Sequence, residues 1–374
     1  KYVVPIVPDE ARTFGMEGMF RQLGIYSSIG QLYEPQDSDQ VMFYKEQKDG
    51  QILEEGINEA GSFSSWIAAA TSYSTTGIQT IPFYIFYSMF GFQRIGDLAW
   101  AAGDSRARGF LLGATAGRTT LNGEGLQHED GHSHLISATI PNCVSYDPCF
   151  AYELAVIIQN GLERMIQNQE DVYYYITVMN ENYQHPEMPK NIEKNIIQGI
   201  YKFSESKLKA PKVQLMGSGV ILREVIAAAK MLESEWNVSA DIYSVTSFTE
   251  LRREALDNER WNMLNPDKKQ KISIIQEMIS DQESPVVAST DYMKSYAEQI
   301  ANFIPNKFVS LGTDGYGRSD SREALRSFFE VDRYYIVVAA LKALVDSKKI
   351  DIEILTKAIR KYKMNNNKPN PVSI

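Results

Sequence analysis

The second half of the chain alternates short apolar runs with amphipathic segments, and this alternation constrains the fold more than any other feature. Residues 212–216 (KVQLM) have the length and composition of a buried strand, and residues 221–235 have the spacing of an amphipathic helix. Further strands are predicted at 241–246, 286–289 and 308–311, with a helix over 292–303. This order of elements predicts an open, mainly parallel sheet with helices on both faces.

The first half is richer in glycine, serine, threonine and aromatic residues. It carries apolar runs at 81–90 and 172–178, and helices are expected over 51–73 and 151–167. A charged stretch at 190–194 is the candidate linker. Because a chain of 374 residues suits two or three domains, we predict two doubly wound α/β domains, over residues 1–190 and 191–374.

Composition excludes several classes of partner. The net charge of -9 disfavours nucleic acid, because phosphate binding needs a basic surface. No apolar run reaches the roughly 18 residues that cross a bilayer, and we recognise no secretory signal, so a soluble, membrane-free protein is expected. Cys143 and Cys149 are too few for a disulfide scaffold and fit a reducing cytosol.

Residues 117–140 (GRTTLNGEGLQHEDGHSHLISATI) hold three of the four histidines, His128, His132 and His134, beside Glu129 and Asp130. Glycines among them let backbone approach a ligand, and histidine moves protons near neutral pH. The preferred interpretation is a loop whose His128 exchanges a hydrogen bond with a bound ligand. Two alternatives stay open. One is an HExxH zinc site, which requires a helix that the glycines disfavour. The other is a loop whose histidines only satisfy backbone groups.

Three further motifs are ambiguous. Glu55 and Glu59 fall four residues apart on the predicted helix, which suits either a solvated acidic face or a buried proton donor. Tyr84, Tyr87 and Phe90 form a stripe that is more often core than cofactor platform, with Arg94 and Asp97 as a polar edge. Residues 217–219 (GSG) resemble half a dinucleotide fingerprint, but a lone GxG is usually a tight turn.

Five segments together resemble the thiamine diphosphate enzymes, and most closely the family of decarboxylating components of the bacterial homodimeric pyruvate dehydrogenase. They are residues 8–27 (PDEARTFGMEGMFRQLGIYS), 50–62, 81–104, 117–134 and 312–332 (GTDGYGRSDSREALRSFFEVD). The resemblance covers essentially the whole chain. It implies a pyrimidine-binding α/β domain followed by a transketolase-like C-terminal domain.

The resemblance also implies roles for single residues. Glu59 corresponds to the activating glutamate that shares a proton with the pyrimidine nitrogen of the cofactor. Tyr87 and Phe90 match positions where aromatic rings pack on the pyrimidine, and His128 matches a histidine that faces the reacting carbon. Glu10 resembles a second buried acid near the dimer interface, on a proton path with Glu59. The implied reaction is decarboxylation of pyruvate followed by reductive acetylation of a lipoyl group.

One departure from the family is large. The diphosphate and magnesium motif begins Gly-Asp-Gly and ends in Asn-Asn, and this sequence has neither at the required spacing. We therefore expect the diphosphate-binding domain to be absent, no metal ligands on this chain, and thiamine diphosphate and Mg²⁺ to require the missing domain. The chain is expected to be the C-terminal part of a longer polypeptide or half of a split enzyme, inactive alone.

The expected partners are a second copy of the chain in a homodimer, pyruvate, and the lipoyl-bearing acyltransferase of the complex, in the bacterial cytoplasm. Rival functions remain at this point. They are another thiamine-dependent activity on the same scaffold, such as transketolase or a different 2-oxo acid dehydrogenase, a non-catalytic dimerisation module, and a zinc hydrolase.

Overall fold

The structure is a computed structural model, and it describes residues 2–8 and 11–374. Contacts between Cα atoms divide the chain into two compact units. The first comprises Lys1–Thr115, Ile136–Val144 and Gly161–Val178, and the second comprises Ala116–Leu135, Ser145–Asn160 and Met179–Ile374. Two short segments from the first half of the sequence thus belong to the second unit. The predicted domain boundary between residues 190 and 191 stays a prediction.

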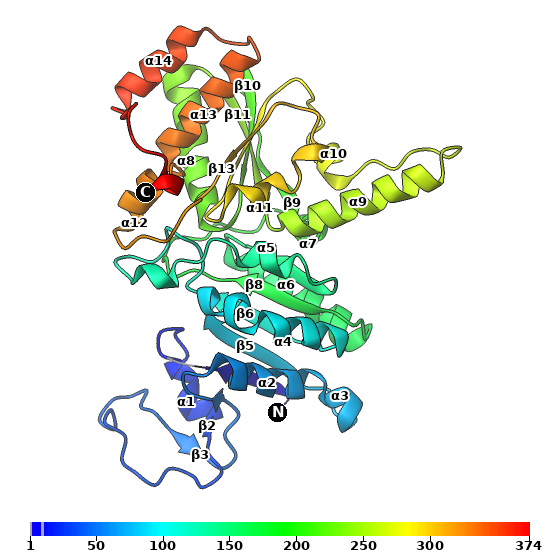
Figure 1. Ribbon diagram of the computed structural model, residues 1–374, viewed down its shortest axis with the longest axis vertical. Helices are drawn as coiled ribbons and strands as arrows, with labels where there is room; N and C mark the ends of the chain where they lie inside the picture. Colours follow the sequence, from blue (N-terminus) through cyan, green and yellow to red (C-terminus); the bar gives the residue numbers. More distant parts are fainter. Residues whose placement is uncertain (1, 9–10) are drawn as a thin grey trace. The chain divides into compact units, whose positions relative to one another are not determined.

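The first unit is built on a six-stranded sheet in the order β4-β1-β5-β6-β8-β7 (Figure 1). Its strands are β1 (Val3–Val7), β4 (Leu53–Glu54), β5 (Ile81–Tyr87), β6 (Phe110–Ala114), β7 (Cys143–Tyr146) and β8 (Tyr173–Thr177). The pairs β4–β1, β1–β5, β5–β6 and β6–β8 are parallel. A separate parallel pair joins β2 (Ile25–Tyr26) and β3 (Glu46–Gln47).

Helices of the first unit pack their aromatic residues onto this sheet. They are α1 (Glu17–Leu23), α2 (Glu59–Ala70), α3 (Ser72–Thr75), the short η1 (Ser88–Phe90), α4 (Phe92–Asp104) and the π-helical turn η3 (Glu163–Gln167). Phe63 and Trp66 of α2 stack with ring centroids 5.0 Å apart, and Trp66 meets Tyr173 of β8 edge-on at 5.6 Å. The core of this unit therefore lies between α2, α4 and the sheet.

The predicted helix over 51–73 was wrong in its first turns. Leu53 and Glu54 form β4, Gly56 adopts a positive φ of 81°, and Asn58 caps α2 at its start. The helix therefore begins at Glu59, and Glu55 does not share a helix face with it. The chain passes from one unit to the other within α5 (Ser133–Ser137) and within α6 (Ala151–Leu162). Together, α6 and η3 cover residues 151–167, which confirms the helix expected there.

The second unit contains a five-stranded sheet in the order β13-β12-β10-β11-β9. Its strands are β9 (Ile200–Ser204), β10 (Lys212–Gly217), β11 (Ser239–Val245), β12 (Val286–Ser289) and β13 (Phe308–Leu311). The pairs β10–β11, β10–β12 and β12–β13 are parallel, as predicted, and the edge strand β9 pairs antiparallel with β11.

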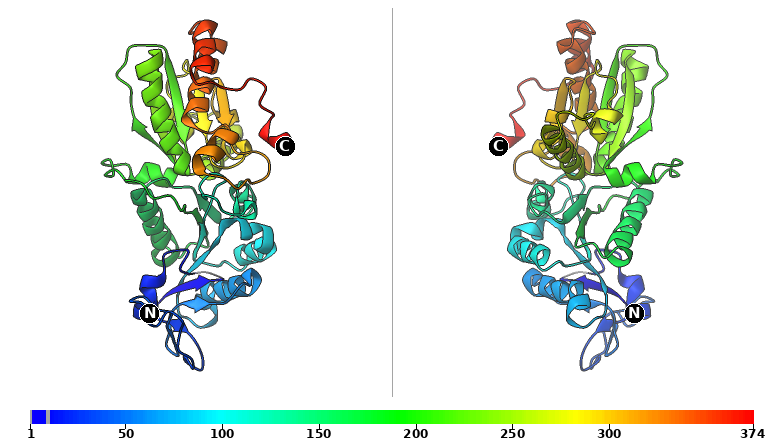
Figure 2. Two further views of the ribbon diagram at one scale, coloured as in Figure 1. Left: turned by 90° about the vertical axis from the view of Figure 1, so that its left-hand side faces the viewer. Right: turned by 90° about the vertical axis from the view of Figure 1, so that its right-hand side faces the viewer.

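Helices cover both faces of this second sheet (Figures 1 and 2). They are α7 (Glu193–Gln198), α8 (Leu222–Trp236), α9 (Phe248–Leu264), α10 (Ile274–Met278), α11 (Lys294–Glu298), α12 (Arg322–Phe328), α13 (Arg333–Asp346) and α14 (Ile352–Lys361), with short turns η4 (Gly219–Ile221), η5 (Ala301–Phe303) and η6 (Pro371–Ser373). One core lies under α8, α13 and α14, and a second lies under α9, α10 and α11. The helix predicted over 292–303 is instead two short pieces, α11 and η5.

Within residues 2–8 and 11–374, every helix is too short or too polar to span a bilayer. The GSG segment forms the turn after β10. Gly219 has a φ of 49°, and a Cβ there would lie 2.6 Å from the carboxylate of Asp147, which accepts a hydrogen bond from Ser218 Oγ at 2.8 Å. A carboxylate therefore fills the place where the dinucleotide interpretation puts a phosphate, and the turn packs against protein.

Candidate functional site

Glu59 is held at the first position of α2. Asn58 precedes it, and its side-chain Oδ1 accepts a hydrogen bond from the backbone N–H of Gly61 at 3.0 Å. The unpaired N–H groups of a helix start stabilise a nearby negative charge. The Glu59 side chain is only 13% exposed, and its Oε1 accepts a hydrogen bond from Arg94 Nη1 at 2.7 Å. The local fold therefore fixes a single largely buried carboxylate beside one guanidinium.

Three aromatic rings, each in contact with the next, extend from the Arg94 side of this ion pair. The guanidinium carbon of Arg94 lies 4.1 Å from the centre of the Phe90 ring, a cation–π contact. Phe90 meets Tyr87 edge-on at 6.0 Å, and Tyr87 meets Phe14 edge-on at 5.2 Å. Tyr87 and Phe90 are half-buried. Three residues singled out from the sequence, Glu59, Tyr87 and Phe90, thus share one cluster in the first unit.

Tyr84 differs from the other two members of the aromatic stripe. It is fully buried in the core, and its hydroxyl lies 3.3 Å from Ser62 Oγ and 3.4 Å from the backbone carbonyl of Glu59. Burial raises the pKa of Tyr84, so the phenol stays protonated. Its hydroxyl braces the first turn of α2. The core interpretation of the stripe is therefore right for Tyr84.

Sequence reasoning missed the partner of Glu59. Arg94 was noted only as a polar edge, and it lies 35 residues from Glu59 in the sequence. The available signal was its position just after the aromatic run, on the helix that follows β5. Glu10, the second acid implied by the resemblance, lies outside the described residues.

His128 belongs to the second unit, on the glycine-rich loop. The short η2 (Leu126–His128) ends at this residue, so the HExxH spacing does not place His128 and His132 on one helix face. His128 Nδ1 lies 3.3 Å from Glu124 Oε1, and the imidazole is 19% exposed. Throughout residues 2–8 and 11–374, no group of three or more histidine, cysteine, aspartate or glutamate side chains is arranged to hold a metal ion.

His134 has a structural environment. It is fully buried, stacks on Tyr296 with centroids 4.6 Å apart, and meets Tyr292 edge-on at 4.8 Å. Burial lowers the pKa of His134 well below its ordinary value, so the ring is neutral. Asp130 accepts hydrogen bonds from the backbone N–H groups of His132 and Ser133 at 3.1 and 3.0 Å. These contacts bury His134 and hold the loop, whereas His128 and His132 are only half-buried.

Glu129 is the unexpected residue of the loop. Its side chain is fully buried, and neither carboxyl oxygen has a hydrogen-bond partner within the described part of the chain. Burial, followed by the charge of Asp291, raises the pKa of Glu129 to about 9, against the opposite effect of Arg118. The carboxyl group is therefore protonated at neutral pH. Its type and position were visible in the sequence, but its burial was not.

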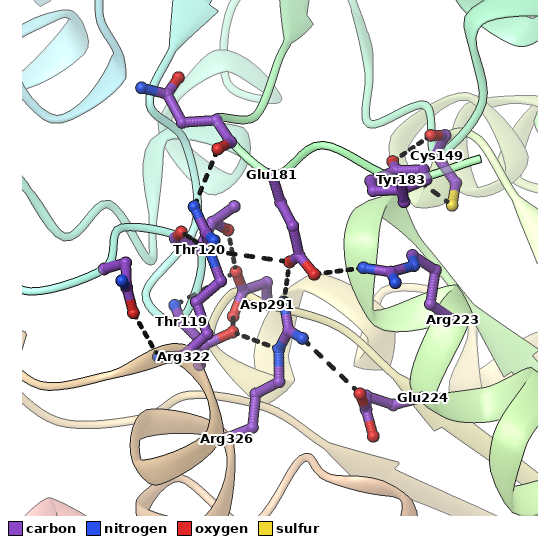
Figure 3. Close-up of polar contacts among 12 residues, drawn as sticks. Thr119, Thr120, Cys149, Glu181, Tyr183, Arg223, Glu224, Asp291, Arg322 and Arg326 are labelled. Atoms are coloured by element: carbon purple, nitrogen blue, oxygen red, sulfur yellow. Dashed lines mark hydrogen bonds and ion pairs between the residues drawn. The ribbon is translucent and has the colours of Figure 1, made fainter. Parts of the chain in front are cut away.

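A buried polar network anchors the start of this loop (Figure 3). Asp291 accepts hydrogen bonds from the hydroxyls of Thr119 at 2.8 Å and Thr120 at 2.9 Å. Arg326 pairs with Glu181 in the same network. Burial raises the pKa of Asp291 to about 6, opposed by Arg326 and the two threonines. Gly117 is required here, because a Cβ on it would lie 2.1 Å from Asp291 Oδ2.

Comparison with known families assigns most of the chain. Residues 1–186 match the family described as pyruvate dehydrogenase E1 component middle domain, and residues 199–332 match the transketolase-like TK C-terminal domain. The chain is 65% identical over 372 residues to the pyruvate dehydrogenase E1 component of Pseudomonas aeruginosa, and 60% identical over 371 residues to that of Escherichia coli K12. Each alignment covers 99% of this chain but 42% of the relative. The chain therefore spans less than half the length of these relatives.

Solved structures share the fold at low sequence identity. A transketolase from Leishmania mexicana superposes with a TM-score of 0.65 at 14% identity, over 94% of this chain and 43% of that chain. A chain described as a split gene transketolase, inactive beta4 tetramer, superposes with a TM-score of 0.54 at 15% identity, over 90% of this chain and 97% of that chain. At such identities the likeness concerns the fold alone, and it confirms the predicted transketolase-like α/β class.

Proposed function

This chain belongs to the family of pyruvate dehydrogenase E1 components, and on that premise we propose that it supplies the pyrimidine-binding part of a thiamine diphosphate site that decarboxylates pyruvate. The observation that carries the proposal is the fixed Glu59 carboxylate, 13% exposed at the start of α2, whose partner Arg94 lies over the Phe90 ring. A single acid next to half-buried aromatic rings fits a flat heteroaromatic ring that shares a proton.

The residues of this cluster have separate tasks in the proposal. Thiamine diphosphate, when bound, supplies the nucleophilic carbon and the electron sink of the reaction. Glu59 holds a proton at a carboxyl oxygen and shares it with the ring nitrogen of the pyrimidine. Tyr87 and Phe90 pack on the ring and exclude water. Arg94 keeps the Glu59 side chain in one rotamer, because their ion pair joins α2 to α4.

We assign His128 to the substrate side of the reaction. Its imidazole is partly exposed on a loop in which Glu129, Asp130 and His134 are buried, and it lies next to the exposed Glu124 carboxylate. In the proposal this imidazole donates a hydrogen bond or a proton to the reacting group, or accepts one from it. Glu10 keeps its proposed role on a proton path with Glu59.

The remaining parts of the proposal concern the complete protein. The sequence lacks the Gly-Asp-Gly and Asn-Asn motif, so we place the diphosphate and Mg²⁺ on a segment outside these 374 residues. A homodimer, a lipoyl-bearing acyltransferase partner and the bacterial cytoplasm follow from the family. The domain boundary near residue 190 is supported by family matches that end at 186 and resume at 199.

The 374-residue chain alone should therefore show no pyruvate decarboxylation, even with thiamine diphosphate and Mg²⁺. The split gene transketolase chain, described as an inactive tetramer, is a precedent on the same fold. Release of CO₂ from labelled pyruvate is the measurement. Turnover by this chain alone would show that the whole cofactor site lies within it.

In the complete enzyme, Glu59→Gln should lower kcat by about 10²–10⁴-fold while the protein stays folded. Glutamine keeps the size of the side chain and cannot share the carboxyl proton. The matched control is Glu55→Gln, an identical change at an exposed position that the structure places before the helix. Steady-state CO₂ release and circular dichroism give the two readouts. Equal kcat in the two variants would remove Glu59 from the chemistry.

His128→Ala belongs in the same assay. Its expected signature is a large fall in kcat with little change in the thiamine diphosphate concentration that gives half-maximal activity. The reverse pattern, normal kcat at saturation but weak cofactor binding, would place His128 on the cofactor instead of the substrate.

A further inference from the structure

A cavity of about 720 Å³ opens in the second unit, among the first turns of α12 and α13 and the segment that follows α14. None of its lining residues belongs to the 117–134 loop or to the cluster around Glu59. The volume lies within the roughly 300–1,000 Å³ of ligand pockets. The proposed reaction gives this cavity no task.

The lining is positively charged, although the chain as a whole is acidic. Five cationic side chains line it: Arg322, Arg326, Arg333, Lys363 and Lys368. Three acidic side chains line it: Glu224, Glu323 and Asp332. The lining side chains balance at five minus three, or +2, in a chain whose net charge is -9, and two of the cations, Arg326 and Lys368, also pair with Glu181 and Glu330 outside the lining. Attraction of an anion into the cavity therefore depends on the other three cations, Arg322, Arg333 and Lys363.

Two of the arginines are fixed and still have unused donors. Arg333 donates to Glu224 through Nε at 2.9 Å and through Nη2 at 3.0 Å. Arg322 donates through Nε to the carbonyl of Thr120 and through Nη2 to the carbonyl of Asn180. A guanidinium has five N–H donors. The Nη1 group of each arginine has no acceptor within the described part of the chain, so both are pre-oriented for a further oxygen ligand.

Lysine and tyrosine side chains complete the lining. Lys363 is exposed and forms no ion pair within residues 2–8 and 11–374. Lys368 is held by the backbone carbonyls of Ser327 and Phe328, both at 2.7 Å, and by an ion pair with Glu330 at 3.3 Å, so it is not counted among the contacts of a ligand. Tyr334 also lines the cavity, and the residue is 45% exposed. Phenolic hydroxyl, ammonium and guanidinium groups all donate hydrogen bonds to phosphate oxygens.

From this lining we propose that the cavity binds a phosphate-bearing small molecule, with Arg322, Arg333 and Lys363 as its charged contacts. A dianionic phosphate needs more than one cation, and three with unused donors face one space here. A carboxylate ligand is the nearest chemical competitor. The cavity is a binding site separate from the decarboxylation chemistry, so the proposal stands or falls independently of the proposed function.

The test uses isothermal titration of the 374-residue chain with inorganic pyrophosphate, and with citrate as the polycarboxylate. Lys363→Glu should raise the Kd for pyrophosphate about tenfold or more, the usual scale of a lost charged contact. The matched control is Lys357→Glu, the same charge change at a 69% exposed side chain of α14 outside the cavity. It should change the Kd less than about twofold, since screened surface charges contribute little.

A second measurement avoids any question of misfolding in the variants. Pyrophosphate should protect Lys363, and not Lys357, from acylation in the unmodified chain, as read by peptide mass spectrometry. Absence of binding at millimolar pyrophosphate, equal effects of the two substitutions, or equal protection of the two lysines would overturn the proposal. Tighter binding of citrate than of pyrophosphate would overturn the phosphate assignment.

Discussion

Glu129 stands one residue after His128, and its environment inverts the usual chemistry of a carboxylate. Full burial keeps the group protonated, because water does not reach it and the Asp291 charge is of the same sign. Within the fold it is therefore a neutral group with a proton to give. No spacing rule marks such a residue, since HED reads as an exposed acidic pair. Its role depends on contacts that the sequence does not display.

The free energy of unfolding of the Glu129→Gln variant should increase, relative to that of the parent chain, as the pH rises. The unfolded carboxyl loses its proton near pH 4.5 and the folded one near pH 9. Unfolding thus releases a proton between these values, and the free energy of unfolding of the parent chain falls with pH by up to about 1.4 kcal/mol per unit. Glutamine has no proton to release. Urea titrations from pH 5 to 8 measure the difference between the variants, with the exposed Glu55→Gln as control.

A difference in unfolding free energy between Glu129→Gln and the parent chain that stays constant across this pH range would mean that Glu129 ionises normally in the folded protein.

At the scale of residues, the sequence supported the cluster of Glu59, Tyr87 and Phe90 only through the family resemblance. The ion pair with Arg94 and the burial of Glu129 are tertiary facts. Glu59 and Arg94 are 35 positions apart in the sequence. Glu129 and Asp291, whose charge helps to raise the pKa of Glu129, are 162 positions apart.

At the scale of elements, β12 and β13 coincide with their predicted residues, since parallel strands in a sheet covered by helices read as short, mostly apolar runs. The helix over 51–73 failed for a local reason. Leu53 and Ile57 have helical spacing, but Gly56 takes a positive φ and Asn58 prefers the cap position. The cap residue, and not the apolar spacing, decides where α2 begins and so where Glu59 stands.

Asn58→Ala should therefore affect activity beyond its cost in stability. Removing a side-chain cap costs about 1 kcal/mol, and here the freed first turn carries Glu59. The matched control is Asp351→Ala, which removes the cap of α14, where the Asp351 carboxylate accepts from Glu353 N at 3.0 Å. Thermal unfolding and kcat of the complete enzyme are the measurements. We expect the two variants to lose similar amounts of stability, and kcat to fall further in Asn58→Ala than in Asp351→Ala. Equal kcat values in the two variants would contradict the prediction.

At the scale of the whole molecule, the sequence order and the contact units differ. Residues 116–135 and 145–160 fall within the predicted first domain, yet they belong to the second unit. Cys149 and Phe150 lie in one of its cores, and Ala116 lies in the other. Composition and periodicity are read along the chain, so they place a boundary but do not reveal segments that cross it. This interleaving was outside the reach of sequence reasoning.

A chain cut to residues 191–374 should unfold without the cooperativity of the intact chain. It loses the Thr119 and Thr120 bonds to Asp291, the Asp147 bond to Ser218 and part of two cores. Buried polar groups left without partners cost about 1–3 kcal/mol each. Thermal melts by circular dichroism and binding of a hydrophobic dye compare the two proteins. A sharp transition at the temperature of the intact chain would make residues 191–374 a self-sufficient folding domain.

Residues 116–135, which belong to the second unit, are also synthesised long before most of that unit. Thr120 and Asp291 are 171 residues apart, and ribosomes add about 5–20 residues each second, so on the order of 10–30 s separate their emergence. During that interval the glycine-rich loop that carries His128 is outside the ribosome, whereas Asp291, which anchors the loop, has not yet emerged. The loop proposed to face the substrate therefore lacks the aspartate that anchors it while the next 171 residues of the chain are added.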